Sequence, residues 1–389
     1  MSFSLTGLTA VSALGAGVAA HADALRTRRS GLRANDYEGA TGGWIGRVPG
    51  IESHRLPPDL QAYDCRNNRL ADMALRTDGF LATVAAAVAR YGAGRIAVVL
   101  GTSTSGVEAA EIAYRGRDDS GALPASFDFR GTQDIASIGA YVQRALGLAG
   151  PVMVVSTACA SSARSMVDAA RLIQAGLCDA AVVGGADTLC RMTLHGFASL
   201  ELISPFATRP CSADRAGISI GEAAGFALLE RDGPADALRL LGWGVSSDGY
   251  HMSTPHPEGA GAIAAMNGAL GRAGLEPGAI DWVNLHGTGT RANDAAEDRA
   301  VAALLDGVDV PVSSTKGWTG HTLGACGVLE AVLALCCLRE GYAAGCLGID
   351  APDPAFATRV LVQHEARPVR HVLSNAFGFG GTNCSLVFG

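Results

Sequence analysis

Cys159 is the residue whose type and setting point most directly to covalent chemistry. It follows the apolar run Val152–Val155 and precedes an Ala-rich segment that we expect to form a helix from about Ser161 to Ala175. Backbone N–H groups and the dipole at a helix start favour a thiolate, and the small neighbours of Cys159 leave room for a substrate. Cys159 is therefore a candidate nucleophile; the alternative is a buried, inert cysteine.

His286 follows the apolar run Ile280–Leu285 and opens the turn His-Gly-Thr-Gly-Thr. A histidine that leaves a strand and enters a glycine-rich turn packs poorly in a core but is well placed to act in a site. The hydroxyls of Thr288 and Thr290 in this turn can hold the amides of a substrate arm. On this turn alone, a hydrogen-bonded loop histidine remains the alternative.

Lys316 and His321 lie five residues apart in a Gly/Thr-rich segment that leads into an apolar helix. Such side chains are rarely buried without a partner. A cation beside His286 and His321 keeps both imidazoles neutral and usable as hydrogen-bond donors or bases. We expect Glu297, on the helix after His286, to pair with Lys316.

The segment Asn375–Asn383 reads NAFGFGGTN and contains Phe377 and Phe379 among three glycines. Its glycines predict a tight or flexible loop whose backbone N–H groups are free to donate. It is therefore a candidate half of an oxyanion hole, with an ordinary glycine turn as the alternative.

The elements around these residues alternate between apolar strands and Ala-rich helices, which predicts a sheet covered on both faces. Each half of the chain contains a strand, a small-residue turn with a reactive side chain, and a helix. This predicts two duplicated α/β halves, 1–240 with the nucleophile and 241–389 with the two histidines and the lysine. The expected strands are Arg95–Leu100, Val152–Val155, Asp179–Val183, Ile280–Leu285, Val310–Ser313 and Val369–Leu373, and the expected later helices are Asn293–Leu305 and Ala325–Leu338.

Composition excludes several classes of protein. Hydrophobic residues make up 48% of the 389 residues, enough for a large core, and the net charge of −7 argues against a nucleic-acid partner. The basic run of Arg26, Arg28, Arg29 and Arg33 is either a solvated helix end or part of a docking surface for an acidic carrier protein.

The ten cysteines form no Cys-x-x-Cys pair, which argues against a zinc site and suits a reducing compartment, the cytoplasm. The first twenty residues are apolar but lack a basic start, so we expect a strand near Phe3–Leu8 and a helix from about Gly17 instead of a signal peptide. No apolar run is long enough to predict a membrane span.

Four motifs together resemble those of the β-ketoacyl-acyl-carrier-protein synthases, the ketosynthases of the thiolase superfamily. They are TACASS at 157–162, HGTGT at 286–290, Lys316 with Thr-Gly-His at 319–321, and GFGGTN at 378–383. They stand in the family's order and at compatible spacings, and the resemblance covers essentially the whole chain.

The resemblance implies a thiolase-like, five-layered α/β/α/β/α fold and a decarboxylative condensation of an acyl group with a malonyl thioester. Cys159 is then the acyl-carrying nucleophile, and His286 and His321 stabilise the enolate. Lys316 orients the two histidines with Glu297 as its partner. Further implied roles are an oxyanion hole from the N–H groups of Cys159 and Phe379, a gate at Phe379, and substrate contacts at Thr288, Thr290, Asp248, His251 and Phe377.

The resemblance implies no metal and no resident cofactor, because phosphopantetheine arrives on the acyl carrier protein. It also implies a dimer, either of identical chains or with a chain-length-factor-like subunit. The segment 204–215 is shorter than in common fatty-acid elongation members, and GEAAG at 221–225 varies from the usual glycine pattern. We therefore expect fatty-acid synthesis or a specialised polyketide pathway, for instance one that makes polyenes such as aryl polyenes.

Three other interpretations were weighed against this one. A thiolase needs a second catalytic cysteine in a Cys-Gly setting near the C-terminus, and Cys384 precedes Ser385. Enzymes that prime chains from acyl-CoA use a Cys-His-Asn set, whereas His321 stands here in place of the asparagine. A non-catalytic chain-length factor lacks the cysteine that this chain has at position 159.

Overall fold

Two sets of strands run through the molecule and meet at one short pairing. The computed structural model describes residues 2–39, 42–234 and 237–389. The first set has the order β1-β9-β7-β5-β6 and the second the order β10-β17-β16-β11-β12-β14. They join where β1 pairs with β10 at Phe3↔Leu240 and Ser4↔Arg239.

The strands of the first set are β1 (Phe3–Ser12), β9 (Ala223–Glu230), β7 (Ala180–Asp187), β5 (Ile96–Gly101) and β6 (Val152–Val155). Those of the second are β10 (Arg239–Ser247), β17 (Thr382–Phe388), β16 (Val372–Gly378), β11 (Trp282–Asn284), β12 (Pro311–Ser313) and β14 (Arg359–Val360).

The two sets repeat the same pairing pattern. From the junction outward, each set has two antiparallel pairings followed by two parallel ones. In the first set, β1-β9-β7 are antiparallel neighbours and β7-β5-β6 are parallel. In the second set, β10-β17-β16 are antiparallel neighbours and β16-β11-β12 are parallel. A shared pattern of five strands is what a duplicated α/β unit produces. The strand β14 extends the second set.

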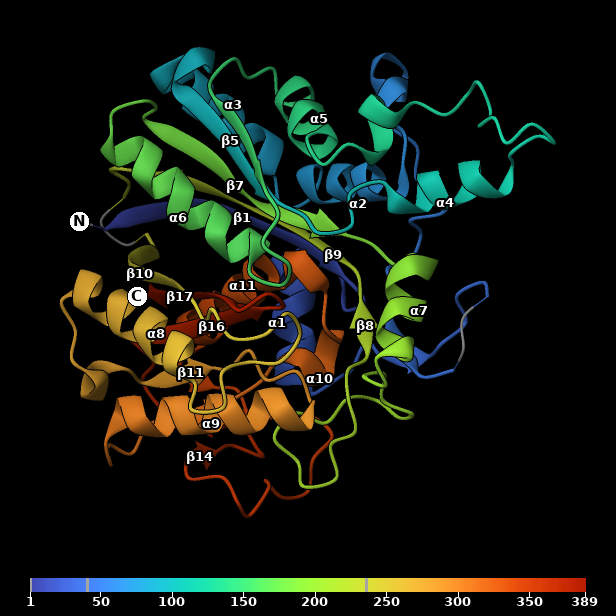
Figure 1. The fold of residues 1–389 in the computed structure, drawn as a ribbon. Helices are drawn as coiled ribbons and strands as arrows, with labels where there is room; N and C mark the ends of the chain where they lie inside the picture. The colour runs from blue at the N-terminus through green and yellow to red at the C-terminus, as the bar shows by residue number, and fades with distance from the viewer. Residues whose placement is uncertain (1, 40–41, 235–236) are drawn as a thin grey trace.

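Helices fill three layers around these strands (Figure 1). The central layer holds α6 (Ser161–Gln174) and α11 (Cys326–Glu340). The outer layer of the first half holds α2 (Arg66–Leu75), α3 (Phe80–Tyr91) and α5 (Ser137–Ala145). The outer layer of the second half holds α8 (Ala260–Ala273) and α9 (Arg291–Leu305). The fold is therefore the expected α/β/α/β/α arrangement.

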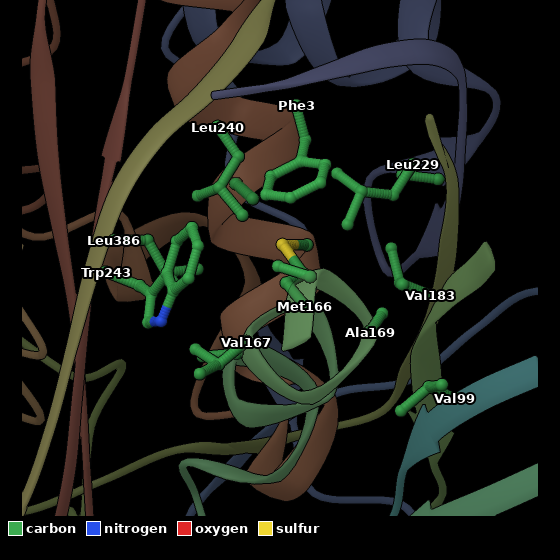
Figure 2. Packing of buried hydrophobic residues seen from close by; sticks show 14 of the residues in the cluster. Phe3, Val99, Met166, Val167, Ala169, Val183, Leu229, Leu240, Trp243 and Leu386 are labelled. Carbon is green, nitrogen blue, oxygen red and sulfur yellow. The ribbon is translucent and has the colours of Figure 1, made fainter. Parts of the chain in front are cut away.

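The central layer is buried against strands of both halves. Figure 2 shows Met166 and Val167 of α6 beside Phe3 and Leu229 from the first half and Trp243 from the second. The helix α11 is buried on all sides from Cys326 to Cys337, as its apolar sequence predicts. The two halves consequently share one core, and the reactive turns emerge at the ends of the strands that flank it.

Other elements lie at the margins of these layers. The helix α1 (Val18–Arg26) packs against α11. In the first half, α4 (Val107–Arg115) follows the loop after β5, and α7 (Arg191–Ser199) follows β7. The remaining short elements are β2 (Gly15–Ala16), β3 (Arg33–Ala34), β4 (Trp44–Gly46), β8 (Ile220–Gly221), α10 (Lys316–Thr319), β13 (Tyr342–Ala343) and β15 (Glu365–Ala366).

Several expected strand boundaries differ from the structure: β1 extends to Ser12, and β11 is shorter than expected. The strand predicted to end at Gly184-Gly185 continues to Asp187, because these glycines let neighbouring strands approach closely: a Cβ at Gly185 would lie 1.9 Å from the carbonyl oxygen of Gly101. The strand expected at 369–373 begins at Val372. The glycine-rich loop forms the tip of the β16–β17 hairpin, with Gly380 and Gly381 at positive φ.

Among the described residues, no helix combines the length and the apolar character that crossing a membrane requires. All ten cysteines are free and buried. The arginines of the basic run largely bind within the chain: Arg28 donates to the carbonyl oxygens of Cys346 and Val362, and Arg26 pairs with Asp23.

Candidate active site

Cys159 stands on a sharp turn between β6 and α6. Ala158, just before it, has φ +49°, a left-handed backbone that is strained for a non-glycine residue. The sulfur of Cys159 lies 2.9 Å from Nε2 of His321. Burial raises the pKa of the Cys159 thiol to about 11, against the opposing effects of Lys316 and of the N–H groups of Phe379 and Cys159. Desolvation thus outweighs the groups that favour a thiolate, and the structure favours a thiol beside an imidazole.

His286 and His321 face each other at the end of one cavity. Their rings are almost perpendicular, with centroids 5.2 Å apart, and both side chains are buried. Burial, followed by the charge of Lys316, lowers the pKa of each imidazole well below its usual value. Both histidines are consequently neutral near pH 7, as predicted from the sequence.

The backbone of His321 is held like a strand residue beside β8. Its N–H donates to the carbonyl oxygen of Ser219 at 2.7 Å, and its carbonyl oxygen accepts from the N–H of Gly221 at 2.9 Å. A Cβ on Gly221 would lie 2.2 Å from the carbonyl oxygen of Thr319. The glycine therefore permits the close approach that fixes the His321 backbone.

Lys316 lies behind His286. Its ammonium donates to the carbonyl oxygen of His286 at 2.5 Å and lies 3.4 Å from Nδ1 of the same residue. It forms a buried ion pair with Glu330 of α11. Burial opposes the charge on Lys316, but Glu330, together with Cys326 and Glu297, outweighs this effect and raises the lysine's pKa.

The predicted pairing of Glu297 with Lys316 is wrong. The carboxylate of Glu297 accepts hydrogen bonds from the backbone N–H groups of His286 at 2.7 Å and Gly287 at 2.8 Å, and from Nδ2 of Asn375 at 3.2 Å. Glu297 therefore fixes the turn that carries His286. Glu330 is not among the residues predicted from the sequence, although it is the only charged residue in the apolar segment Ala325–Leu338.

The tip of the β16–β17 hairpin closes over the sulfur. The N–H of Phe379 is directed at Cys159, and a Cβ on Gly378 would lie 2.8 Å from the carbonyl oxygen of Thr157 and 3.2 Å from the nitrogen of Cys159. Glycine at 378 thus lets the hairpin approach the nucleophile. The ring of Phe379 is 37% exposed and lies 5.6 Å from that of Phe197.

A cavity of about 600 Å³ leads from Cys159, His286 and His321 to the surface. The residues predicted to contact substrate line it: Thr288, Thr290, Asp248, His251, Phe377 and Phe379. Several of them also have local hydrogen-bond partners. Thr290 accepts a hydrogen bond from the N–H of Asn293 at the start of α9, and Asp248 accepts from Nδ2 of Asn383 at 2.7 Å. The segments 102–107 and 133–138 do not line this cavity.

Two family models match the chain in succession. Residues 4–235 match the β-ketoacyl synthase N-terminal domain, and residues 238–350 match the β-ketoacyl synthase C-terminal domain. The chain belongs to the β-ketoacyl synthase family. The family and the thiolase-like α/β fold predicted from the sequence are therefore confirmed.

Relatives of this ketosynthase include the 3-oxoacyl-[acyl-carrier-protein] synthase 2 of Vibrio cholerae. It is 35% identical over 315 residues, which are 76% of this chain and 76% of that protein. The mitochondrial 3-oxoacyl-[acyl-carrier-protein] synthase of Arabidopsis thaliana is 39% identical over 64% of this chain, and the match spans 58% of that protein's length. These names agree with the predicted acyltransferase class.

Among solved structures, the ketosynthase ApeO in complex with its chain length factor ApeC from Xenorhabdus doucetiae is similar. It has a TM-score of 0.90 and 39% identity, with 100% of this chain and 98% of that chain covered. The ishigamide ketosynthase/chain length factor has a TM-score of 0.90 at 27% identity, again with 100% and 98% coverage.

Within the part of this ketosynthase that the structure describes, two sets of side chains have the donor types of a metal site. Ligand atoms of Cys159, His286 and His321 lie within 4.8 Å of one another, as do those of His286, Cys326 and Glu330. The Lys316 ammonium is bonded to Glu330 and lies 3.4 Å from His286, so its charge opposes a second cation at either set. The arrangement is better suited to thiol exchange and to hydrogen bonding of a developing negative charge.

Proposed function

We propose that this ketosynthase condenses an acyl group held on Cys159 with malonyl-acyl carrier protein, losing carbon dioxide and giving a β-ketoacyl-acyl carrier protein. One observation carries the proposal. At the end of a single cavity, a thiol faces two neutral imidazoles and two backbone N–H groups. This set supplies a nucleophile, two donors for an enolate and an oxyanion hole.

In the first half-reaction, the Cys159 sulfur attacks the carbonyl carbon of the incoming acyl thioester while its proton passes to Nε2 of His321, 2.9 Å away. The carbonyl oxygen, now negative, faces the N–H groups of Cys159 and Phe379. The bond to the carrier's sulfur breaks, and that thiolate takes the proton from His321. The acyl group stays on Cys159.

In the second half-reaction, the malonyl carbon–carboxylate bond breaks and its electron pair forms an enolate. Lys316 lies at Nδ1 of His286, which places the proton of this neutral ring on Nε2, where it can donate to the enolate oxygen. The enolate carbon attacks the acyl-Cys159 carbonyl. Collapse of the oxyanion expels the sulfur of Cys159, which takes up one proton.

The cavity mouth supports delivery by a carrier arm. Thr288 and Thr290 present hydroxyls 2.9 Å apart on the cavity wall, where they can hold the amides of phosphopantetheine. Phe377, Asp248 and His251 line the same passage. We assign the acyl carrier protein as the partner at this mouth and Phe379 as the gate between the mouth and Cys159.

A second chain of the same fold is the proposed partner at the free edge of the first strand set, which is β6. The edge strand β6 consists of four apolar residues, and Val152 is 40% exposed. Exposed apolar edges of this kind are normally covered by another chain.

The ten buried free thiols support a reducing, cytoplasmic setting. We divide the chain into the halves 1–240 and 241–389.

A catalytic subunit that requires a chain-length-factor-like partner is the second candidate. The similarity to two ketosynthases solved together with chain length factors favours it. Sizing the purified chain alone and after co-expression with such a subunit from the same source separates a homodimer from a heterodimer.

The direct test is the intact mass of the protein after incubation with acyl-carrier thioesters of different length and unsaturation. We expect an acyl adduct on the wild type and none on Cys159→Ala, which keeps the fold. Adduct formation by Cys159→Ala would overturn the nucleophile assignment. No adduct on the wild type, even with a co-expressed partner subunit, would overturn the proposed function.

A further inference from the structure

Asp187 is a buried carboxylate at the end of β7 that no step above uses. It is 0% exposed, and no Lys, Arg or His nitrogen lies within 4.0 Å of it among the described residues. Its charge is instead balanced by hydrogen-bond donors from two separate loops. A buried anion without a cation is costly unless its oxygens are well bonded.

Three donors come from hydroxyls of the loop after β5. Thr102 Oγ1 and Thr104 Oγ1 donate to Oδ1 of Asp187 at 2.7 and 2.8 Å, and Ser103 Oγ donates to Oδ2 at 2.5 Å. The backbone N–H groups of Ser103 and Thr104 add bonds to Oδ1 at 2.8 Å each. This explains why the hydroxyl-rich segment 102–104 faces inward without lining the substrate cavity.

One more donor comes from the turn that follows His321. The N–H of Gly324 donates to Oδ2 of Asp187 at 2.5 Å. Leu323, just before it, has φ +54°, a conformation that is unfavourable for a leucine. A Cβ on Gly324 would lie 2.7 Å from Oδ2 of Asp187 and 3.2 Å from the carbonyl oxygen of Ala158. This turn therefore fits between the carboxylate and the turn that carries Cys159.

Three strained turns thus meet around one carboxylate. Ser105, Ala158 and Leu323 all have positive φ, and they belong to the loop after β5, the turn of Cys159 and the turn after His321. Strained backbone persists only where its surroundings hold it. Asp187 binds two of these turns directly, and Gly324 lies between Asp187 and the third.

We propose that Asp187 is a positioning residue of the condensation site: it holds the turn after His321 against the loop 102–104 and so sets the distance between His321 and Cys159. The inference rests on the proposed function, because it concerns the histidine used in both half-reactions. Displacement of a reacting group by about 1 Å can lower a rate by about 100-fold, so a residue in this position controls turnover without touching the substrate.

Asp187→Asn is the informative variant, because it keeps the shape but replaces one acceptor oxygen by an NH₂ donor. At Oδ2 the NH₂ faces the N–H of Gly324, and at Oδ1 it faces the N–H of Thr104. In either orientation a backbone donor loses its acceptor. We expect kcat for malonyl decarboxylation to fall by about 100-fold with KM within about twofold, because the mouth of the cavity is unchanged.

Asp298→Asn is the matched control. Asp298 is also a buried carboxylate, and it accepts from the N–H groups of Ala357 and Thr358 and from Thr358 Oγ1, away from the cavity. We expect both variants to lose a similar amount of thermal stability and only Asp187→Asn to lose kcat. Equal kcat in the two variants, or an effect of Asp187→Asn confined to KM, would overturn the inference.

Ser103→Ala decides the case if Asp187→Asn does not fold. It removes the donor to Oδ2 and the nearby oxygen that lies 3.3 Å from the N–H of Gly324. We expect kcat to fall by about tenfold without loss of fold; wild-type kcat would overturn the inference. Failure of the proposed function itself would appear differently, as absence of malonyl decarboxylation by the wild type.

Discussion

Lys316 and Glu330 form a buried ion pair directly behind His286. The lysine is 1% exposed and the glutamate 3% exposed, and the same ammonium bonds to the carbonyl oxygen of His286. Neither side chain lines the substrate cavity. The pair therefore acts on the imidazole: it places a fixed positive charge at Nδ1 and leaves Nε2 to the substrate.

Replacing Lys316 by Met tests this role. Burial lowers the pKa of His286, and Lys316 lowers it further. Without the cation, only burial and His321 lower the pKa of His286, so the imidazole becomes protonated at a higher pH than in the wild type. We expect malonyl decarboxylation by Lys316→Met to be about 10- to 100-fold slower at pH 8 and to fall further toward pH 6, whereas the wild type stays active there.

Lys316→Arg is the control for charge, since it retains a cation but changes its shape. The pH profile of decarboxylation from pH 6 to 8 is the measurement. If Lys316→Met and the wild type showed the same profile, the lysine would not be setting the charge state of His286.

The buried histidines also predict how stability depends on pH. The pKa of His321 is lowered in the folded protein by burial, so below about pH 6.5 the unfolded chain binds a proton that the folded chain does not. The contribution of this group is present above pH 6.5 and is lost as the pH falls. In urea unfolding at pH 7.5 and 5.5, we expect the wild type to lose stability relative to His321→Asn by about 1 kcal/mol. A constant difference between the two proteins would show that His321 does not titrate differently on folding.

Glu297 is expected to support activity through the backbone of His286. In Glu297→Gln, the amide NH₂ faces one of the two N–H groups that the carboxylate binds. An unsatisfied buried donor costs about 1–3 kcal/mol of stability, and the turn that carries His286 loosens. We expect kcat to fall by about tenfold.

The neighbouring Asp298→Asn provides the comparison for Glu297→Gln, because both remove one acceptor from a buried carboxylate of α9. Thermal unfolding and malonyl decarboxylation are measured on both variants. A rate loss of the same size in Asp298→Asn would mean that general destabilisation, and not the His286 turn, explains the effect.

The sequence singled out the residues that the structure brings together, because each of them leaves a strand or enters a helix in a turn of small residues. That local setting made Cys159, His286 and His321 candidates, and the occurrence of several such turns in one chain strengthened each of them. The partner of Lys316 could not be recognised in this way, because Glu330 lies 14 residues after Lys316 in the chain, on α11, and reaches the lysine only once that helix is placed in the core. Glu297 was correctly placed beside His286, but the partner predicted for it was wrong. Periodicity does not show whether a carboxylate binds a side chain or the backbone.

The strand β7 illustrates a second limit. Two glycines in a row favour a turn, but here they allow β7 to pass within van der Waals distance of β5 and β9 and to place Asp187 under the active site. The charge state of Cys159 shows a third limit. Position at a helix start favours a thiolate, but the depth of burial, which reverses the balance, follows only from the packed structure.

Two variants of Phe379 separate the oxyanion-hole role of its N–H from the gating role of its ring. Its N–H faces the sulfur of Cys159, while its ring is exposed at the cavity beside Phe197. Phe379→Ala removes the ring and keeps the N–H, whereas Phe379→Pro removes both. We expect Phe379→Pro to acylate Cys159 roughly 100- to 1000-fold more slowly than Phe379→Ala, the effect of losing one oxyanion donor. The rate of acyl-adduct formation by intact mass compares the two variants. Since both lack the ring, equal rates would show that the N–H of Phe379 does not stabilise the oxyanion, and a change in preferred acyl length common to both would assign the gate to the ring.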